Sequence, residues 1–396
     1  MVIFPQSGHE GDTRCWNEWT KQIFTAGLGN VYKFGTDYLP LYHYILWLFG
    51  KFQGSTALIE QNIYYLKIIT LLFDFLTGFY LIKLLYAKFT DLNQSVFYSL
   101  LFFLNIAYFY NTLIWGQVDG ILACLIFLAF FYSIKSNVLV ALIFIVLSLN
   151  FKLQSIIFLP LLGLLLLRSM VKNFSFKKLL VWLAVPVTLQ LLILTPFIIT
   201  GDLERVWNVV TGSVGKYPVV SMNAHNFWSL ALKGNLMEIQ DNTRLFGITY
   251  KSWGLFLFFS TSLLTLWPLL RNTITTICFD GETETQLTID KTLLIAALVP
   301  MLFFFLNTQM HERYLHPAMI FLAAYSLISK EYFPYVLGSI AYFLNLEGVL
   351  RYLQLRNYDI LIFHSGFIAG LFFVCIGYLF LKLYKIIPDN VLHNKC

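Results

Sequence analysis

Short polar clusters that interrupt long apolar runs contain the residues best suited to chemistry. The first, GHEGDTRCWNEW, places Asp12 just before residues 14–26, where Trp16, Trp19 and later apolar residues recur at helical spacing. This pattern predicts an amphipathic helix on the lipid headgroups, with Asp12 as its N-cap and the tryptophans at the interface. Alternatively, Asp12 is a base held at the membrane surface, because a carboxylate in that setting can accept a proton from a hydroxyl group.

Two further clusters combine an amide with a charged side chain. The glycines of IWGQVDG allow a tight turn, in which Asp119 can cap the helix predicted from residue 120. The amide of Gln117 in this turn can hydrogen-bond to hydroxyl groups. In NFKLQ, Lys152 and Gln154 stand between two apolar runs. The lysine either snorkels to the lipid surface or is a fixed cation facing the interior of a helical bundle.

The densest cluster is NTQMHERYLHP, which contains His311, Glu312, Arg313 and His316. An arginine binds phosphate through its planar fork, and a histidine can add a second donor, so the cluster suits a phosphate group. In the alternative interpretation, Glu312 neutralises Arg313 within a structural network. The spacing does not fit the zinc motif HExxH. We therefore expect no metal site and no cofactor.

Two weaker signals complete the set. Asp37 and Tyr38 stand before Pro40, which favours an extended turn into a helix; a role in shaping a sugar site is the alternative. Asn223 and His225, in NAHNFWSL, stand beside an aromatic residue. Amides next to an aromatic ring suit a sugar, whose faces stack on the ring and whose rim forms hydrogen bonds.

The composition indicates what kind of structure positions these clusters. Of 396 residues, 58% are hydrophobic and 12% charged, against about 25% charged in a typical soluble domain. Apolar runs near the roughly 20 residues needed to cross hydrocarbon predict an all-α, polytopic transmembrane bundle that forms a single domain over residues 1–396. About eleven spans are predicted, at residues 63–89, 94–114, 120–134, 137–151, 154–171, 179–200, 253–271, 291–307, 314–329, 332–347 and 359–384.

One basic loop predicts the orientation of the bundle. Residues 168–178, RSMVKNFSFKK, contain basic side chains and no acid, so the positive-inside rule places them in the cytoplasm. Alternation then places residues 1–62 and 201–252 outside, together with the polar clusters. The net charge of +6 is distributed between apolar runs and favours lipid headgroups, not nucleic acid, as the partner. On that outer face a base would activate an acceptor hydroxyl, and cations would take the charge developing on a leaving phosphate.

The ordered motifs GD-x2-C-W-x2-W, DYLPLYxYxLW, WGQVD, FKLQ and HERYLHP resemble the C-type glycosyltransferase superfamily. The most similar members are bacterial membrane proteins related to the second mannosyltransferase of GPI-anchor assembly, and the resemblance covers about residues 11 to 317. It implies a polyprenyl-phosphate-linked sugar as donor substrate, with mannose favoured, and a glycan, lipid or protein acceptor. It also implies transfer on the outer face of a bacterial-type cell membrane, usually with inversion.

The resemblance assigns the catalytic base to Asp12. Leu39 and Leu153 replace prolines of the family's pattern, whereas the His-Glu-Arg-Tyr motif is intact. Family members begin with a transmembrane helix before the catalytic loop, so we expect that the start of this chain is misplaced or truncated and that a twelfth helix belongs there. Motifs and resemblance together predict these substrate-binding residues: Trp16, Asp37, Tyr38, Gln117, Asp119, Lys152, Gln154, Asn223, His225, His311, Glu312, Arg313 and Tyr314.

Three other functions fit the same sequence. A flippase or transporter of lipid-linked sugars would favour inverted repeats and broken helices, with its site near the membrane midplane. A polysaccharide polymerase would share the outer-face site but use diphosphate-linked oligosaccharides. A non-catalytic assembly subunit would need none of the predicted chemistry.

Overall fold

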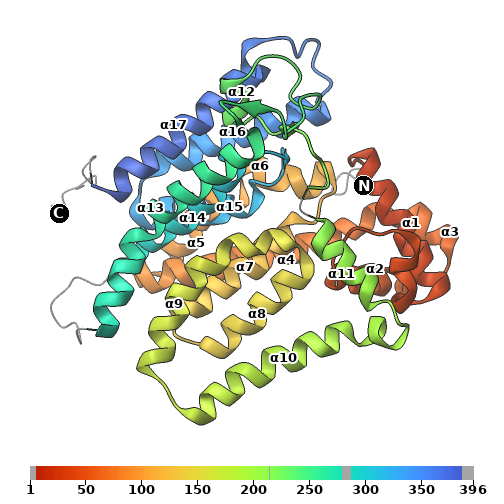
Figure 1. Cartoon of the computed structure of the whole chain (residues 1–396), viewed down its shortest axis with the longest axis horizontal. Helices are drawn as coiled ribbons and strands as arrows, with labels where there is room; N and C mark the ends of the chain where they lie inside the picture. Colours follow the sequence, from red (N-terminus) through yellow and green to blue (C-terminus); the bar gives the residue numbers. More distant parts are fainter. Residues whose placement is uncertain (1–5, 214, 279–286, 386–396) are drawn as a thin grey trace. The chain divides into compact units, whose positions relative to one another are not determined.

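A computed structural model describes residues 6–213, 215–278 and 287–385. The described chain is almost entirely helical, with only short strands, which confirms the all-α prediction (Figure 1). It divides into two compact units. Unit 1 comprises residues 1–77 and 109–216, and unit 2 comprises residues 78–108 and 217–396. Each unit is described separately.

Unit 1 begins with a helical segment and continues into apolar helices. Its π-helical turn, Asn111–Trp115, ends at Gly116, whose φ of 79° is a left-handed conformation that favours glycine. The helices are α1 (Glu10–Ala26), α2 (Pro40–Gln53), α3 (Thr56–Asn62), the first part of α4 (Lys67–Phe89), α7 (Asp119–Ile134), α8 (Val138–Phe151), α9 (Leu159–Lys172), α10 (Phe176–Ile199) and α11 (Leu203–Gly212), with 3-10 segments at Leu28–Phe34, Ile63–Leu66 and Leu153–Phe158.

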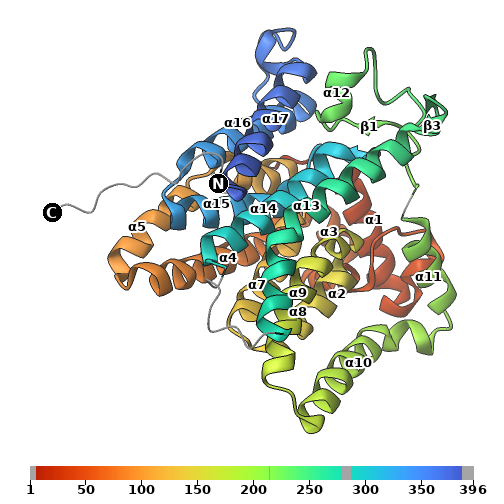
Figure 2. The same ribbon diagram turned by 60° about the vertical axis from the view of Figure 1, so that its left-hand side comes forward.

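Two helices of unit 1 show opposite burial. α7 is apolar on all sides and almost completely buried, as expected for a helix without a polar face. α10 is also apolar, but most of its side chains are exposed, including Leu183, Val187 and Leu191. It runs along the edge of unit 1 beside α8 (Figures 1 and 2). A helix of 24 residues is long enough to cross a lipid bilayer, whose hydrocarbon would cover these exposed apolar side chains.

Unit 2 is built around α14 and α15, which are buried along nearly their whole lengths. Two parallel residue pairs join β1 to β4 and thereby bring Ser221 and Met222 beside Met310 and His311. The elements of this unit are the end of α4, α5 (Leu92–Phe103), α6 (Ile106–Tyr110), β1 (Ser221–Met222), α12 (Phe227–Ala231), β2 (Arg244–Leu245), β3 (Ile248–Thr249), α13 (Tyr250–Cys278), α14 (Ile289–Leu306), β4 (Met310–His311), α15 (His316–Ser329), α16 (Tyr332–Leu350), a 3-10 segment (Leu361–Phe363) and α17 (Ser365–Leu383).

Several described helices are long and apolar enough to cross a membrane, which indicates a membrane protein. By length and composition there are seven in the described residues, or eight if the bent pair Leu92–Phe103 and Ile106–Trp115 forms one span. Three further apolar helices, α7, α8 and α15, are shorter. Each predicted span overlaps helical residues, although 94–114 covers the bent pair and 359–384 begins before α17. The count of eleven spans stays a prediction. The seven are Thr56–Phe89, Leu153–Lys172, Phe176–Ile199, Tyr250–Cys278, Ile289–Leu306, Tyr332–Leu350 and Ser365–Leu383.

Candidate functional site

The first helix starts earlier than the sequence predicted. α1 begins at Glu10 with His9 at its N-cap, so the prediction of Asp12 as N-cap is wrong. Asp12 instead lies in the first helical turn, where the positive end of the helix dipole favours a carboxylate. The apolar periodicity begins only at Trp16, and for this reason it did not reveal the polar first turn.

Two nitrogen atoms lie close to one oxygen of the Asp12 carboxylate. The Trp115 indole Nε1 donates to Oδ2 at 3.1 Å, and His9 Nδ1 lies 3.3 Å from the same oxygen. The His9 ring also stacks on the Trp115 ring at 5.4 Å between centroids. The Asp12 side chain is 18% exposed. These contacts orient the carboxylate while one side of it remains accessible to solvent.

The tryptophans of α1 pack inside unit 1 rather than on a lipid surface. Trp16 and Trp19 are buried, so the prediction that they form an interface belt is wrong. The Trp16 ring contacts the rings of Tyr38 and Tyr42 edge-on, both at 4.9 Å. Its Nε1 donates to the carbonyl of Gly116 at 3.4 Å. Trp16 therefore connects α1 to the loop before α2 and to the turn before α7, a structural role that also fixes the position of Asp12.

Asp119 and Lys152 form an ion pair that joins two helix ends. Asp119 is the first residue of α7 and follows the N-cap Val118, so the prediction of Asp119 as a helix cap is wrong. Its Oδ1 accepts from Lys152 Nζ at 2.6 Å, and its side chain is 1% exposed. Lys152, at the C-cap of α8, is 15% exposed and therefore does not snorkel to a lipid surface. Lys152 also lies 6.0 Å above the Tyr38 ring.

The glutamines beside these charges differ in burial. Gln117 is 1% exposed, and its Oε1 accepts from the backbone N–H of Val118 at 3.4 Å. Its Nε2 is buried and has no hydrogen-bond partner within the described residues, so the turn accounts for only the oxygen of this amide. Gln154 is half-buried in the segment Leu153–Phe158.

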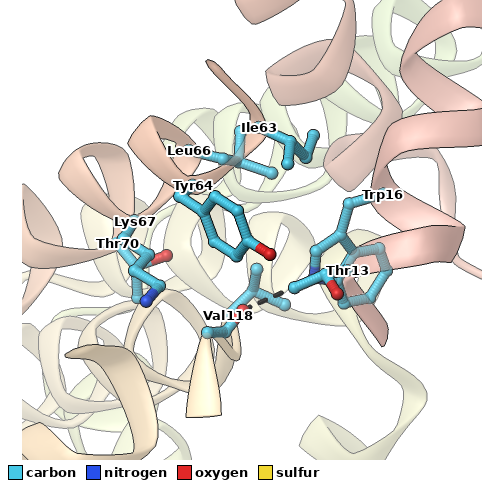
Figure 3. A pocket seen from close by; sticks show the side chains of 9 residues that line it. Thr13, Trp16, Ile63, Tyr64, Leu66, Lys67, Thr70 and Val118 are labelled. Atoms are coloured by element: carbon cyan, nitrogen blue, oxygen red, sulfur yellow. Dashed lines mark hydrogen bonds between the residues drawn. The ribbon is translucent and has the colours of Figure 1, made fainter. Parts of the chain in front are cut away.

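A small cavity lies between α1, the start of α4 and the turn at Gly116 (Figure 3). Figure 3 shows the Tyr64 ring with Lys67 on one side and Thr13 with Trp16 on the other. The volume of about 10 Å³ is room for about one water molecule and not for a sugar. Lys67 Nζ donates to the carbonyl of Leu113 at 2.6 Å. Lys67 thus fixes the π-helical turn that carries Trp115.

A larger apolar pocket of about 300 Å³ lies among α2, α8, α10 and α11. Leu39 and Leu153 in its wall directly follow Tyr38 and Lys152 in the chain. Asn150 and Gln190, also in the wall, donate to each other's side-chain oxygens at 2.6 and 3.0 Å. The remaining lining residues are Pro40, Leu149, Leu194, Leu203, Val206, Trp207 and Val210.

The turn before α2 carries a second pair of opposite charges. Asp37 accepts from Lys216, and both side chains are partly exposed. Burial lowers the pKa of Lys216 from its ordinary value, with a smaller opposing effect of Cys15. Asp37 is therefore an ion-pair partner at the surface of unit 1. The sequence did not indicate Lys216 as a partner of Asp37, because the two residues lie 179 positions apart in the chain.

The His-Glu-Arg-Tyr motif lies in unit 2, at the end of β4. Arg313 Nη1 donates to Glu312 Oε1 at 3.0 Å, and the Glu312 side chain is almost fully buried. His311 Nδ1 lies 4.0 Å from the other oxygen of Glu312, and its ring contacts Tyr217 and Tyr314, both at 5.0 Å. The charge pairing is the structural network considered as the alternative above. Arg313 remains a candidate for phosphate binding, because it is held in place and 12% exposed.

Asn223 and His225 also belong to unit 2. The carbonyl of Asn223 and the backbone N–H of His225 both bond to the side chain of Asn345, at 2.8 and 3.0 Å. Burial, with a smaller effect of His364, lowers the pKa of His225 to about 4, so this imidazole is neutral near pH 7. An isolated antiparallel β-bridge pairs Asn223 with His311 and so brings these two residues together.

Five residues not predicted as site residues contribute to these arrangements: His9, Trp115, Lys67, Lys216 and Tyr42. The hydroxyl of Tyr42 is buried and has no hydrogen-bond partner within the described ranges. Burial, followed by the nearby charge of Asp12, raises the pKa of Tyr42 well above its ordinary value. A histidine three residues before Asp12 was the available signal for His9; the other four required the fold.

Within the described residues, no group of three or more His, Cys, Asp or Glu side chains could hold a metal ion. Comparison of the chain with protein-family models gives no match, and comparison with curated protein sequences gives none either.

Proposed function

We propose that the protein is a membrane glycosyltransferase that moves a hexose from a polyprenyl-phosphate-linked donor to a hydroxyl group of a glycan, lipid or protein acceptor. The observation that carries the proposal is the Asp12 carboxylate, which the Trp115 indole fixes and which is partly exposed at the start of α1. A carboxylate held in this way can accept the proton of an attacking hydroxyl group. The motif resemblance to C-type glycosyltransferases adds mannose as the first sugar to test.

The transfer exchanges two bonds at the anomeric carbon. The acceptor oxygen bonds to this carbon, the bond to the donor phosphate oxygen breaks, and its electron pair leaves with the phosphate. Asp12 takes the hydroxyl proton. A cation would take the negative charge that develops on the leaving phosphate. The basic loop at residues 168–178 favours an outer-face reaction.

The apolar pocket of unit 1 supports a lipid-linked donor. Its volume of about 300 Å³ and its mostly aliphatic wall suit part of an isoprenoid chain. Two of its residues adjoin Tyr38 and Lys152 in the chain, so a lipid in the pocket would extend toward the polar part of unit 1. We expect Val206→Trp to fill the pocket and to raise the KM for a long-chain donor, whereas Leu183→Trp on the exposed face of α10 serves as the matched control.

Purified protein in lipid, incubated with a radiolabelled polyprenyl-phosphate hexose and candidate acceptors, tests the activity. We expect transfer by the wild type and a loss of about 10²–10⁴-fold in Asp12→Asn. Glu10→Gln, an exposed acid in the same helical turn, is the control and should transfer at the normal rate. Normal transfer by Asp12→Asn would contradict Asp12 as the base. Polymer formed only from diphosphate-linked oligosaccharides would indicate the polymerase instead.

The sequence-based prediction that Arg313 binds a phosphate group has a separate test. Arg313→Ala should slow transfer by roughly 10²–10³-fold, since it removes a donor to the developing phosphate charge. Because Arg313 also neutralises Glu312, the double variant Glu312→Gln/Arg313→Ala controls for the uncompensated carboxylate. A near-normal rate in the double variant would exclude Arg313 from phosphate binding.

A transporter of lipid-linked sugars is the second candidate, and one observation favours it. Asp74 is fully buried within the long apolar helix α4, where it accepts from Thr112 at 2.8 Å. Charged side chains within membrane helices often mark transport or proton pathways. Movement of a labelled lipid-linked sugar across vesicles without any covalent transfer, lost in Asp74→Asn, would support the transporter and contradict the transferase.

A further inference from the structure

Two side chains meet the same oxygen of the Asp12 carboxylate, and they differ in chemistry. Trp115 Nε1 lies 3.1 Å from Oδ2 and can only donate its hydrogen. His9 Nδ1 lies 3.3 Å from Oδ2, and an imidazole both accepts and releases protons near neutral pH. Of these two partners, His9 is therefore the one that can remove a proton from Asp12.

The backbone and ring of His9 are held in place. Its backbone N–H donates to the carbonyl of Trp115 at 2.8 Å, and its ring stacks on the Trp115 ring with an interplanar angle of 10°. His9 occupies the N-cap of α1, but its side chain makes no capping hydrogen bond. The imidazole is thus directed toward Asp12 by contacts that helix capping does not require.

Exposure increases from the carboxylate to the imidazole. The Asp12 side chain is 18% exposed, whereas the His9 side chain is 45% exposed. A proton passed from Asp12 to His9 therefore moves from a partly buried group to one in contact with solvent. This direction is the one needed after each transfer, because Asp12 must lose the acceptor's proton before the next turnover.

We propose that His9 positions Asp12 and carries its proton to solvent; this assignment rests on the transferase activity proposed above. When the acceptor oxygen bonds to the anomeric carbon and the phosphate leaves with its electron pair, the hydroxyl proton goes to Asp12. His9 accepts this proton at Nδ1 and releases the proton of Nε2 to water. Proton exchange with water then returns the imidazole to its Nε2–H form. The carboxylate is restored, and no oxidant or further reactant is consumed.

A purely structural role for His9 predicts a different result for one variant. His9→Phe keeps a flat ring against Trp115 but has no atom that can carry a proton. If His9 only packs against Trp115, His9→Phe should be active. If His9 carries the proton, kcat should fall by about 10- to 100-fold in both His9→Phe and His9→Ala. KM should change little, because His9 acts through Asp12 and not on the substrate.

The deciding experiment measures lipid-phosphate-dependent sugar transfer by these variants with and without added imidazole. Because the His9 side chain is 45% exposed, free imidazole can reach the space that His9→Ala leaves. We therefore expect imidazole to restore part of the lost kcat in His9→Ala but none in Asp12→Asn. His364→Asn, which can keep the cap of α17, is the control and should behave as wild type. Thermal midpoints near the wild-type value establish that each variant is folded.

Three outcomes separate the two proposals. Active His9→Phe, or His9→Ala that imidazole does not rescue, overturns the role of His9 while wild-type transfer leaves the proposed function intact. A wild type that transfers no sugar from any lipid phosphate contradicts the proposed function, and the role of His9 fails with it. Loss of kcat in both His9 variants with rescue of His9→Ala supports both proposals.

Discussion

At the scale of single residues, Asp119 and Lys152 show how an ion pair constrains the interior of unit 1. The Asp119 carboxylate is 1% exposed, so Lys152→Met would leave a buried charge without its cation. We expect a loss of about 3–5 kcal/mol in the free energy of unfolding. Asp119→Asn/Lys152→Met should recover part of this loss. Chemical unfolding in detergent provides the measurement, and equal stability of the single and double variants would contradict the expectation.

Gly120 is the second residue whose replacement has a defined result. A Cβ at this position would lie 2.2 Å from Asp74 Oδ1 and 3.1 Å from the Thr70 methyl carbon. We expect Gly120→Ala to lower the free energy of unfolding by about 1–3 kcal/mol through overpacking. A Cβ added at Gly163, in α9, would meet no neighbouring atom within 4 Å. Gly163→Ala is therefore the matched control and should change the free energy of unfolding by less than about 1 kcal/mol. Unfolding midpoints that are similar for Gly120→Ala and Gly163→Ala would contradict overpacking and show that α4 and α7 can move apart.

The residue types of the site were predictable, whereas their partners were not. Asp12, Asp119 and Lys152 stood out because each lies in a short polar cluster beside strongly apolar sequence. The pairing of Asp119 with Lys152 depends on how α7 and α8 turn back on each other, and Trp115 reaches Asp12 across 103 residues. Helical periodicity contains no such long-range information. It also failed at both helix starts, because the predicted caps Asp12 and Asp119 lie inside the first turns.

At the scale of elements, the segment that leads into α2 is fixed by a buried histidine. His43 Nε2 donates to the carbonyl of Tyr38 at 3.1 Å, and its ring contacts Trp19 and Tyr32. Burial lowers the pKa of His43 from 6.5 to about 3, with the hydrogen bond to Tyr38 acting in the opposite direction. The folded protein therefore keeps this imidazole neutral at pH values where the unfolded chain binds a proton.

The lower pKa of His43 in the folded protein predicts how stability changes with pH. The contribution of His43 to stability is fully present above about pH 6.5 and is lost as the pH falls toward about 3, because only the unfolded chain gains the proton. His43→Gln keeps an N–H donor but does not titrate. We expect its stability to fall less steeply than that of the wild type between pH 6.5 and about 4, measured by thermal unfolding. Parallel curves would contradict neutral burial of His43.

The elements themselves were largely predictable because apolar composition and length specify helices in this chain. Each of the eleven predicted segments overlaps helical residues, but residues 94–114 fall on a bent pair of helices, and α7, α8 and α15 are shorter than the other apolar helices. α11 and the small β1–β4 pair were not predicted. Two-residue strands have no periodicity to detect, and their pairing joins segments about 90 residues apart.

At the scale of the whole molecule, the orientation of the chain in the membrane is the prediction to test. We expect a single cysteine at Asn235, within residues 201–252, to react with a membrane-impermeant thiol reagent on intact cells. A cysteine at Lys172, in the basic loop, should react only after the cells are opened, because the positive-inside rule places that loop in the cytoplasm. Both positions are accessible, and a cysteine-free background removes Cys15 and Cys278. The reverse pattern would invert the topology.

The assignment of residues 78–108 to the second unit has a consequence for the timing of synthesis. Asn105 donates to Tyr335 Oη at 2.6 Å and to Ser339 Oγ at 2.8 Å, partners that follow it by 230 and 234 residues. At about 5–20 residues per second, a ribosome needs roughly 10–50 s to make the intervening chain. During that interval Asn105 has neither of these partners, although the whole of unit 1 is made before Tyr335. A nascent chain that stalls before Tyr335 therefore carries an incomplete polar contact within apolar surroundings, which quality-control machinery of the membrane can detect.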